Sequence, residues 1–232
     1  MNKNTTTTRK YIIITALAAV LVLPHNKLFA QQKISFGVHA DPLISWFSTD
    51  VRGVTNNGAR AGFNFGLNFY NYFARNYSFS TGISLISAGG SLTNTDTTVY
   101  EFSNYSATVP GGNPVIYKIQ YLSIPLGLKL QTNQIGYVTF FTDLGLDPKV
   151  VISSKANIPV LDINGENASK ETNLFNLSYH ITAGVEYSLG GTTALVAGIG
   201  FDNNFLDITN DKGRLKDKVS HKLLNFRLGI NF

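Results

Sequence analysis

The sequence predicts an all-β protein that folds as an eight-stranded antiparallel up-and-down transmembrane β-barrel. Three observations support this fold class. Alternating apolar and polar residues recur in eight separate runs, the polar side of each run is built mostly from small side chains, and the connectors between runs alternate between long and short. Alternation with a period of two is typical of strands, and no segment between the runs has a convincing amphipathic helical pattern.

The eight runs are the predicted strands. The clearest is residues 60–70, with the sequence RAGFNFGLNFY. Its apolar residues, among them Phe63, Phe65 and Phe69, fall on one face, and its Gly and Asn residues fall on the other. We therefore assign one strand to each run. The other runs are residues 34–46, 77–87, 117–131, 137–147, 174–188, 193–202 and 223–232.

The composition of the polar faces favours a membrane barrel over a soluble β-sandwich or a lipocalin-like barrel, which also alternate. A face exposed to water is expected to be rich in Lys, Glu, Thr and Arg, whereas Gly, Ser, Asn and Thr predominate here. Small polar side chains suit the hydrated interior of a narrow barrel whose apolar face meets lipid. Lys118 and Gln120 fall in the lipid-facing phase of their run, near its loop end, where they could reach the headgroups.

The connectors follow the order expected of an outer-membrane barrel with both termini in the periplasm. Such barrels alternate long external loops with short periplasmic turns, starting with a loop. Connectors in compact soluble domains are usually short throughout. In this sequence the long connectors are residues 48–59, 88–114, 154–173 and 203–221, and the short ones are residues 74–77, 132–136 and 190–192.

Residues 1–30 are predicted to be a cleaved secretory signal peptide. A polar start with three basic residues precedes the apolar run 11–23 and a short segment that closes on Ala30. That run is too short for a transmembrane helix, which needs about 20 apolar residues. We expect cleavage between Ala30 and Gln31, which leaves residues 31–232 as one outer-membrane β-barrel domain.

Removal of the signal peptide changes the charge balance. The whole chain carries 19 basic and 14 acidic residues, but residues 1–30 hold four of the basic ones and none of the acidic ones. The remainder therefore has 15 basic and 14 acidic residues, and the net charge gives no reason to expect a nucleic-acid partner. The chain has no cysteine, so disulfides cannot stabilise the exported domain.

Three segments resemble the PorT-like outer-membrane β-barrel family, a small "porin family" barrel of diderm bacteria. They are residues 121–132 (YLSIPLGLKLQT), 136–146 (GYVTFFTDLGL) and 224–232 (LNFRLGINF). The resemblance implies the barrel fold and the outer-membrane location, and one member of that family is linked to protein secretion. It implies no mechanism. Ser123 stands where the family often has an acidic residue, so no role is carried over to that position.

The last strand also looks like an insertion signal. Phe226, Leu228, Ile230 and Phe232 alternate on one face and end on an aromatic residue. Such a pattern resembles the signal read by the outer-membrane assembly machinery, which we expect as a partner. We also expect this strand to pair with the first, because a closed barrel leaves no free edge in lipid.

Four charged residues are predicted to point into the barrel near its periplasmic end: Lys129, Asp143, Glu186 and Arg227. Eight strands leave an interior just wide enough to be filled by side chains, so an open pore is not expected. Buried charges must be paired, and we therefore predict a network that plugs the lumen. The alternative is a gated ion path through the same network.

The residues give no clear sign of catalysis, of a cofactor or of a metal. His180 shares a strand face with Ser178 and Glu186, but these lie about 7 and 20 Å from it along a strand. His39, His180 and His221 fall on separate elements and no Cys accompanies them. The glycine pairs of SAGGSL and VPGGNP precede no helix, so they do not form a phosphate-binding loop.

External loops are the expected place of function, because loops on a rigid scaffold commonly carry recognition. The segments 88–114, 154–173 and 203–221 are rich in Ser, Thr, Asn and Gly or in mixed charge. The leading hypothesis is a monomeric barrel with a structural or binding role, accessory to secretion or adhesion through an extracellular or secretion-system protein. A narrow gated channel for ions or small solutes is the alternative, and a lipid-modifying enzyme is a more distant one.

Overall fold

The computed structural model describes residues 34–50, 53–103, 105–210 and 218–232. The predicted signal peptide and the bond between Ala30 and Gln31 lie outside the described residues, as does part of the connector 203–221. All described residues belong to one compact unit, Gln32–Phe232. No helix in the described ranges is long and apolar enough to cross a membrane.

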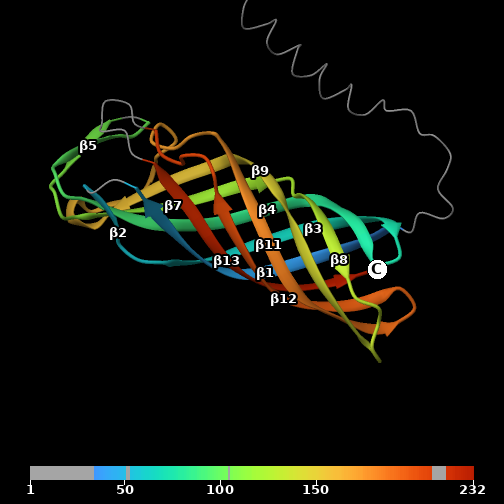
Figure 1. Ribbon diagram of the computed structural model, residues 1–232. Helices are drawn as coiled ribbons and strands as arrows, with labels where there is room; N and C mark the ends of the chain where they lie inside the picture. Colours follow the sequence, from blue (N-terminus) through green and yellow to red (C-terminus); the bar gives the residue numbers. More distant parts are fainter. Residues whose placement is uncertain (1–33, 51–52, 104, 211–217) are drawn as a thin grey trace, which may run out of the picture. The chain divides into compact units, whose positions relative to one another are not determined.

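Antiparallel strands form a closed ring in which each pairs with both of its neighbours (Figure 1). β7 and β8 together occupy one position between β4 and β9, separated by Ile124 and Pro125, so the ring has eight positions. The predicted fold class is confirmed. In ring order the strands are β1 (Ile34–Thr49), β3 (Arg60–Ala74), β4 (Tyr77–Asn94), β7 (Pro114–Ser123) with β8 (Leu126–Gln131), β9 (Val138–Ile158), β11 (Phe175–Gly190), β12 (Thr193–Asn204) and β13 (Val219–Asn231).

The ring closes between β13 and β1, as the sequence predicts. Gly37 to Thr49 of β1 pair with Asn231 to Val219 of β13. The pairing reaches the last residue, since the Phe232 N–H donates to the Phe36 carbonyl at 2.7 Å and the two rings lie 5.4 Å apart. Closure satisfies backbone groups that would otherwise be exposed to lipid.

The strands are staggered around the ring. Following paired residues once around from Trp46 returns to β1 at Phe36, ten residues away. A stagger of this kind requires tilted strands and sets the barrel's width. Side chains that are not cross-strand partners can therefore lie at the same height along the barrel axis. The path is Trp46, Lys222, Asn203, Tyr179, Leu146, Leu126, Thr81, Phe69 and Phe36.

The outer face carries an apolar belt bordered by aromatic side chains. Phe63, Phe65 and Leu67 of β3 are exposed, and corresponding side chains recur around the ring. Aromatic groups gather at both borders, as in barrels of the outer membrane. Around the short turns they are Phe73, Tyr77, Phe79, Tyr137 and Tyr187, and towards the long connectors they are Trp46, Tyr179, Phe201 and Phe205.

The two ends of the barrel differ. Tight turns join β3 to β4 and β11 to β12 at the end where the C-terminus lies (Figure 1), which in such barrels faces the periplasm. The long connectors at the opposite, extracellular end contain further structure. These elements are β2 (Val54–Asn56), β5 (Thr98–Glu101), β6 (Ser106–Val109), η1 (Pro159–Leu161) and β10 (Ile163–Asn167).

Two segments predicted as loops are largely paired. β4 continues to Asn94 and pairs with β7 up to Pro114, and β9 continues to Ile158. The prediction that residues 88–114 and 154–173 are loops is therefore wrong for the parts that form strands. Its error has a physical cause: beyond the membrane the strands no longer present apolar residues outwards, so the alternation that marks the belt is lost.

Apolar side chains fill the barrel at its extracellular end. In β7, Tyr117, Ile119 and Tyr121 point inwards and are buried, whereas Lys118 and Gln120 point outwards. The mostly small and polar inner face predicted for the runs does not extend to this end, where apolar side chains pack together as in a soluble domain. We call this cluster the extracellular core. It consists of Leu43, Phe47, Ile86, Ala88, Leu92, Tyr100, Phe102, Ala107, Val109, Val115, Tyr117, Ile119, Tyr121, Ala156, Ile158, Ala168, Ile208, Val219 and Leu223.

Candidate functional site

Charged and amide side chains occupy the lumen below the extracellular core. Nearest the periplasmic end, Lys129 of β8 forms a buried ion pair with Glu186 of β11. Gln131 and Asn231 donate further hydrogen bonds to the Glu186 carboxylate, at 2.7 and 2.6 Å. The Lys129 ammonium also lies 3.9 Å from the centre of the Tyr70 ring. A buried carboxylate with three donors is held in one position.

A second ion pair lies deeper in the lumen. Arg227 Nε donates to Asp41 Oδ2 at 2.9 Å, and the Leu228 N–H donates to Asp41 Oδ1 at 3.1 Å. Asn64 Nδ2 lies 3.4 Å from the same carboxylate, which is fully buried. Asp41 was not among the four charges singled out in the sequence. Its inward phase in β1, two residues from His39, is the signal that identifies it.

Asp143 takes part in neither ion pair. Its Oδ1 accepts a hydrogen bond from Ser80 at 2.7 Å and lies 3.6 Å from His180 Nε2. The structure thus places Lys129, Asp143 and Glu186 in the lumen as buried residues and Arg227 as a partly buried one. It pairs Lys129 with Glu186, but it gives Arg227 and Asp143 other partners.

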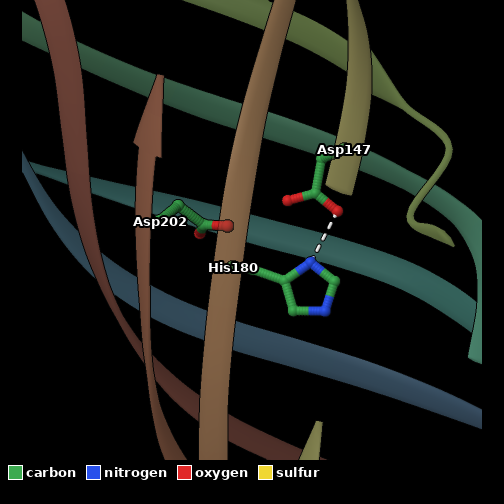
Figure 2. A group of neighbouring side chains, drawn as sticks. All are labelled: Asp147, His180 and Asp202. Carbon is green, nitrogen blue, oxygen red and sulfur yellow. Dashed lines mark hydrogen bonds and ion pairs between the residues drawn. The ribbon is translucent and has the colours of Figure 1, made fainter. Parts of the chain in front are cut away.

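The side chains of Asp147, His180 and Asp202 form a cluster on three neighbouring strands, β9, β11 and β12. Figure 2 shows Asp147 and His180 facing each other with Asp202 beside them. His180 Nδ1 lies 2.9 Å from Asp147 Oδ1, and one potential ligand atom from each residue lies within 4.8 Å of the others. His180 and Asp202 are direct cross-strand partners. The buried Lys149 ammonium interacts electrostatically with both carboxylates.

A glycine makes room for this imidazole. Gly145 of β9 is the cross-strand partner of His180, and a Cβ atom at Gly145 would lie 2.8 Å from His180 Cε1. It would also lie 2.3 Å from the Leu126 carbonyl oxygen. The small residues of the inner face therefore do more than keep the lumen hydrated, since they leave space for the larger side chains opposite.

A cavity of about 40 Å³ lies in this part of the lumen, which is enough for a few water molecules. Its walls are mostly polar, and both the cluster and the Arg227 side chain contribute to them. The wall residues used below are Asn64, Asp147, His180, Asp202, Asn225 and Arg227.

A family model described as "Outer membrane protein beta-barrel domain" matches residues 29–212. This match spans most of the chain. The chain belongs to the outer membrane protein beta-barrel domain family. The protein is therefore an outer-membrane β-barrel, and its narrower resemblance to PorT-like barrels stays a prediction. None of the curated proteins matches the sequence.

Several solved structures of outer-membrane barrels are similar in fold. Neisserial surface protein A (NspA) shares 13% identity at a TM-score of 0.49, covering 86% of this chain and 98% of that one. Ail, the attachment invasion locus protein of Yersinia pestis, shares 13% at 0.44, covering 88% and 100%. OprG from Pseudomonas aeruginosa shares 13% at 0.43, covering 88% and 98%. At this identity the likeness concerns the fold alone.

The three residues considered for catalysis in this outer-membrane barrel are arranged differently from a nucleophile and its base. Ser178 donates to Asp147 Oδ2 at 3.3 Å rather than to His180. Glu186 is bound to Lys129. A serine nucleophile needs a base within hydrogen-bond reach, and here both Ser178 and His180 are directed to the same carboxylate.

Sequence reasoning missed Asp147, Lys149 and Asp202 as lumen residues that act together. Each lies near the end of a run, and their inward phase was readable from the alternation. The signal for this cluster is a His and carboxylates at inward positions of neighbouring strands, and it is not visible when histidines are grouped only with one another or with Cys.

Proposed function

We propose that this protein is a closed outer-membrane barrel that conducts no solutes and acts by binding another molecule through its extracellular part. The observation that carries the proposal is that side chains fill the lumen on both sides of its small polar cavity, while the extracellular part is folded around its own core. We call that part the extracellular extension. It comprises residues 88–121, 153–173, 205–210 and 218–223, apart from the undescribed residue 104.

Two different sets of side chains fill the lumen. The ion pair of Lys129 and Glu186 lies towards the periplasm, and the extracellular core lies above the cavity. Phe47 and Tyr121 are among the largest fully buried side chains of the core. The Tyr121 hydroxyl lies 2.9 Å from His221 Nδ1, so these two buried polar groups satisfy each other. Such packing leaves no continuous path for ions or solutes.

The extracellular extension is held by contacts between its segments. The Glu101 N–H donates to Glu171 Oε1 at 2.6 Å, and the Ser103 N–H donates to the Asn167 carbonyl at 3.3 Å. The hairpin of β5 and β6 is thereby held to the end of β10 and to the segment that follows it. A preformed surface loses less conformational entropy on binding than a flexible loop does, which favours recognition.

Apolar side chains on this extension are exposed to water. Val99 is 52% exposed, Val160 is 49% exposed and Tyr105 is 42% exposed. Tyrosine is enriched in recognition surfaces, and exposed apolar area gives a partner surface to bury. The proposed partner is an extracellular or secretion-system protein, and the biological readouts are attachment of cells and protein secretion.

Surface substitution tests the proposal better than deletion of residues 93–113, because that deletion would remove Tyr100, Phe102 and Val109 from the core. The test variant combines Val99→Ser, Tyr105→Ser and Val160→Ser. We expect normal insertion with reduced attachment or secretion, measured against a deletion strain. The matched control replaces Ile135 and Tyr137, which are exposed at the short-turn end. Unchanged attachment and secretion in the triple variant would contradict the proposal.

A narrow channel is the second candidate function, and the polar cavity is the observation that favours it. Arg227 lines that cavity. If the cavity belonged to a gated ion path, recordings across a planar bilayer would show discrete conductance steps, and Arg227→Ala would change their size. The closed-barrel proposal expects no steps from the unmodified protein.

A further inference from the structure

We propose that the cluster of Asp147, His180 and Asp202 is a binding site for one divalent transition-metal ion inside the barrel. The site is separate from the extracellular surface proposed above, and the two can be tested independently. Four observations carry the inference: the charge balance of the polar lumen, the geometry of the cluster, an amide oxygen without a partner, and the cavity beside it.

The polar lumen has an excess of acidic groups. Among its described side chains, the carboxylates outnumber the fixed cations by five to three, which leaves two negative charges when His39 and His180 are neutral and one when His180 carries a proton. Uncompensated charge is costly in a buried site. One divalent cation offsets the excess. The carboxylates are those of Asp41, Asp143, Asp147, Glu186 and Asp202, and the cations are Lys129, Lys149 and Arg227.

The excess is concentrated at the cluster. Glu186 is paired with Lys129, and Asp41 is paired with Arg227. Asp143, Asp147 and Asp202 are left with the Lys149 ammonium and His180. The unbalanced carboxylates thus surround an imidazole, which is the group that distinguishes transition-metal sites from calcium or magnesium sites.

The geometry suits a common centre. The potential ligand atoms of the three residues all lie within 4.8 Å of one another, and His180 Nδ1 is already 2.9 Å from Asp147 Oδ1. Imidazole nitrogens and carboxylate oxygens bind zinc at about 2.0 to 2.2 Å, so small side-chain rotations would close the site. Because the residues lie on three adjacent strands, their backbones are fixed by the ladders.

An unpartnered amide oxygen lies in the same wall. Asn225 lines the cavity and is more than nine-tenths buried, and its Nδ2 donates to Asp202. Its Oδ1 is buried without a hydrogen-bond partner. A buried acceptor without a donor is costly, and an ion or an ion-bound water would satisfy it. Asn64 Oδ1, in the same cavity wall, is likewise buried without a hydrogen-bond partner.

Zinc is the probe for the test. The barrel is refolded in detergent with and without Zn²⁺, excess metal is removed, and bound zinc is counted by native mass spectrometry. Metal is supplied during folding because the proposed ligands are buried or half-buried inside the barrel. We expect one zinc per barrel, and we expect anomalous diffraction at the zinc edge to place the ion between Asp147, His180 and Asp202. Mg²⁺ at the same concentration is expected to be retained poorly.

Two variants separate ligation from bulk charge. Asp202→Asn removes a proposed ligand, whereas Asp41→Asn removes the same charge from the same lumen without touching the cluster. We expect zinc binding to be at least about tenfold weaker for Asp202→Asn, because loss of even a group that supports a metal ligand has an effect of that size. We expect a clearly smaller change in zinc binding for Asp41→Asn. His180→Gln serves as a second ligand variant if Asp202→Asn does not fold.

Three outcomes would overturn the inference. They are absence of retained zinc from the unmodified barrel, an anomalous peak elsewhere in the molecule, and equal weakening by Asp202→Asn and Asp41→Asn. The first would mean that protons balance the excess carboxylates. None of these outcomes bears on attachment through the extracellular extension, so failure here is distinguishable from failure of the proposed function.

Discussion

Single residues of the inner face decide how the lumen is filled. Gly90 of β4 faces Phe47 of β1, and a Cβ atom at Gly90 would lie 2.5 Å from the Phe47 ring. Phe47 is 1% exposed and belongs to the extracellular core. A glycine is therefore required here because any side chain would overlap the Phe47 ring. Alternating polarity in the sequence does not reveal this requirement.

Replacement of Gly90 by Ala is expected to destabilise the barrel. The added methyl group must displace a buried aromatic ring, and overpacking of this kind costs about 1–3 kcal/mol. The measurement is the free energy of unfolding of the refolded barrel in a urea titration. Gly53→Ala is the control, because no atom lies within 4 Å of its added Cβ. Equal stability of both variants would show that Phe47 moves aside at no cost.

Removal of Arg227 is expected to destabilise the lumen strongly. Arg227→Ala leaves Asp41 buried without its ion-pair partner, and breaking a buried pair in this way costs about 3–5 kcal/mol. Adding Asp41→Asn to the same protein removes the stranded charge and should recover much of that loss. The urea titration checks both. A double variant as unstable as the single one would contradict the assigned pairing.

At the scale of elements, β13 closes the ring and leads directly into Phe232. Phe232 exchanges backbone hydrogen bonds with Phe36 and packs against its ring. Ser35 Oγ also donates to the Phe232 carbonyl at 2.7 Å. We propose in addition that Phe226, Leu228, Ile230 and Phe232 are recognised by the outer-membrane assembly machinery, as the sequence pattern predicts.

Phe232→Ala is expected to reduce insertion in cells, whereas Phe232→Tyr, which keeps the ring, should insert normally. Insertion is measured by heat-modifiable migration of the membrane fraction on gels. Refolding of the same variants into lipid vesicles without any machinery separates the two roles of the residue. An equal defect in cells and in vesicles would mean that Phe232 acts only through its packing on Phe36.

At the scale of the whole molecule, the sequence predicts the membrane part well. Lipid requires an apolar outer face, so alternation identifies the eight runs. The pairing of the first and last strands follows because a closed ring leaves no free edge in lipid. The strands of the extracellular extension were mostly assigned to connectors, because the outward apolar residues that mark the membrane strands end there. These strand segments are residues 88–94, 98–101, 106–109 and 154–158. Alternation identifies strands most clearly where the apolar residues face lipid.

The lumen contacts were predictable only in part. Alternation tells which residues point inwards, but it does not tell their depth, which depends on the stagger between strands. Asp41 therefore meets Arg227, and His180 meets Asp147 and Asp202, in combinations that sequence spacing cannot supply. The stagger is a property of the closed ring and becomes known only when all pairings are known.

The central claim is that the barrel is closed along its length. Current recordings of the purified, refolded protein in a planar bilayer test it most directly. The account predicts no discrete conductance steps at any applied voltage, with the ion pair of Lys129 and Glu186 and the extracellular core in place. Reproducible steps from the unmodified protein, altered by Arg227→Ala, would contradict it.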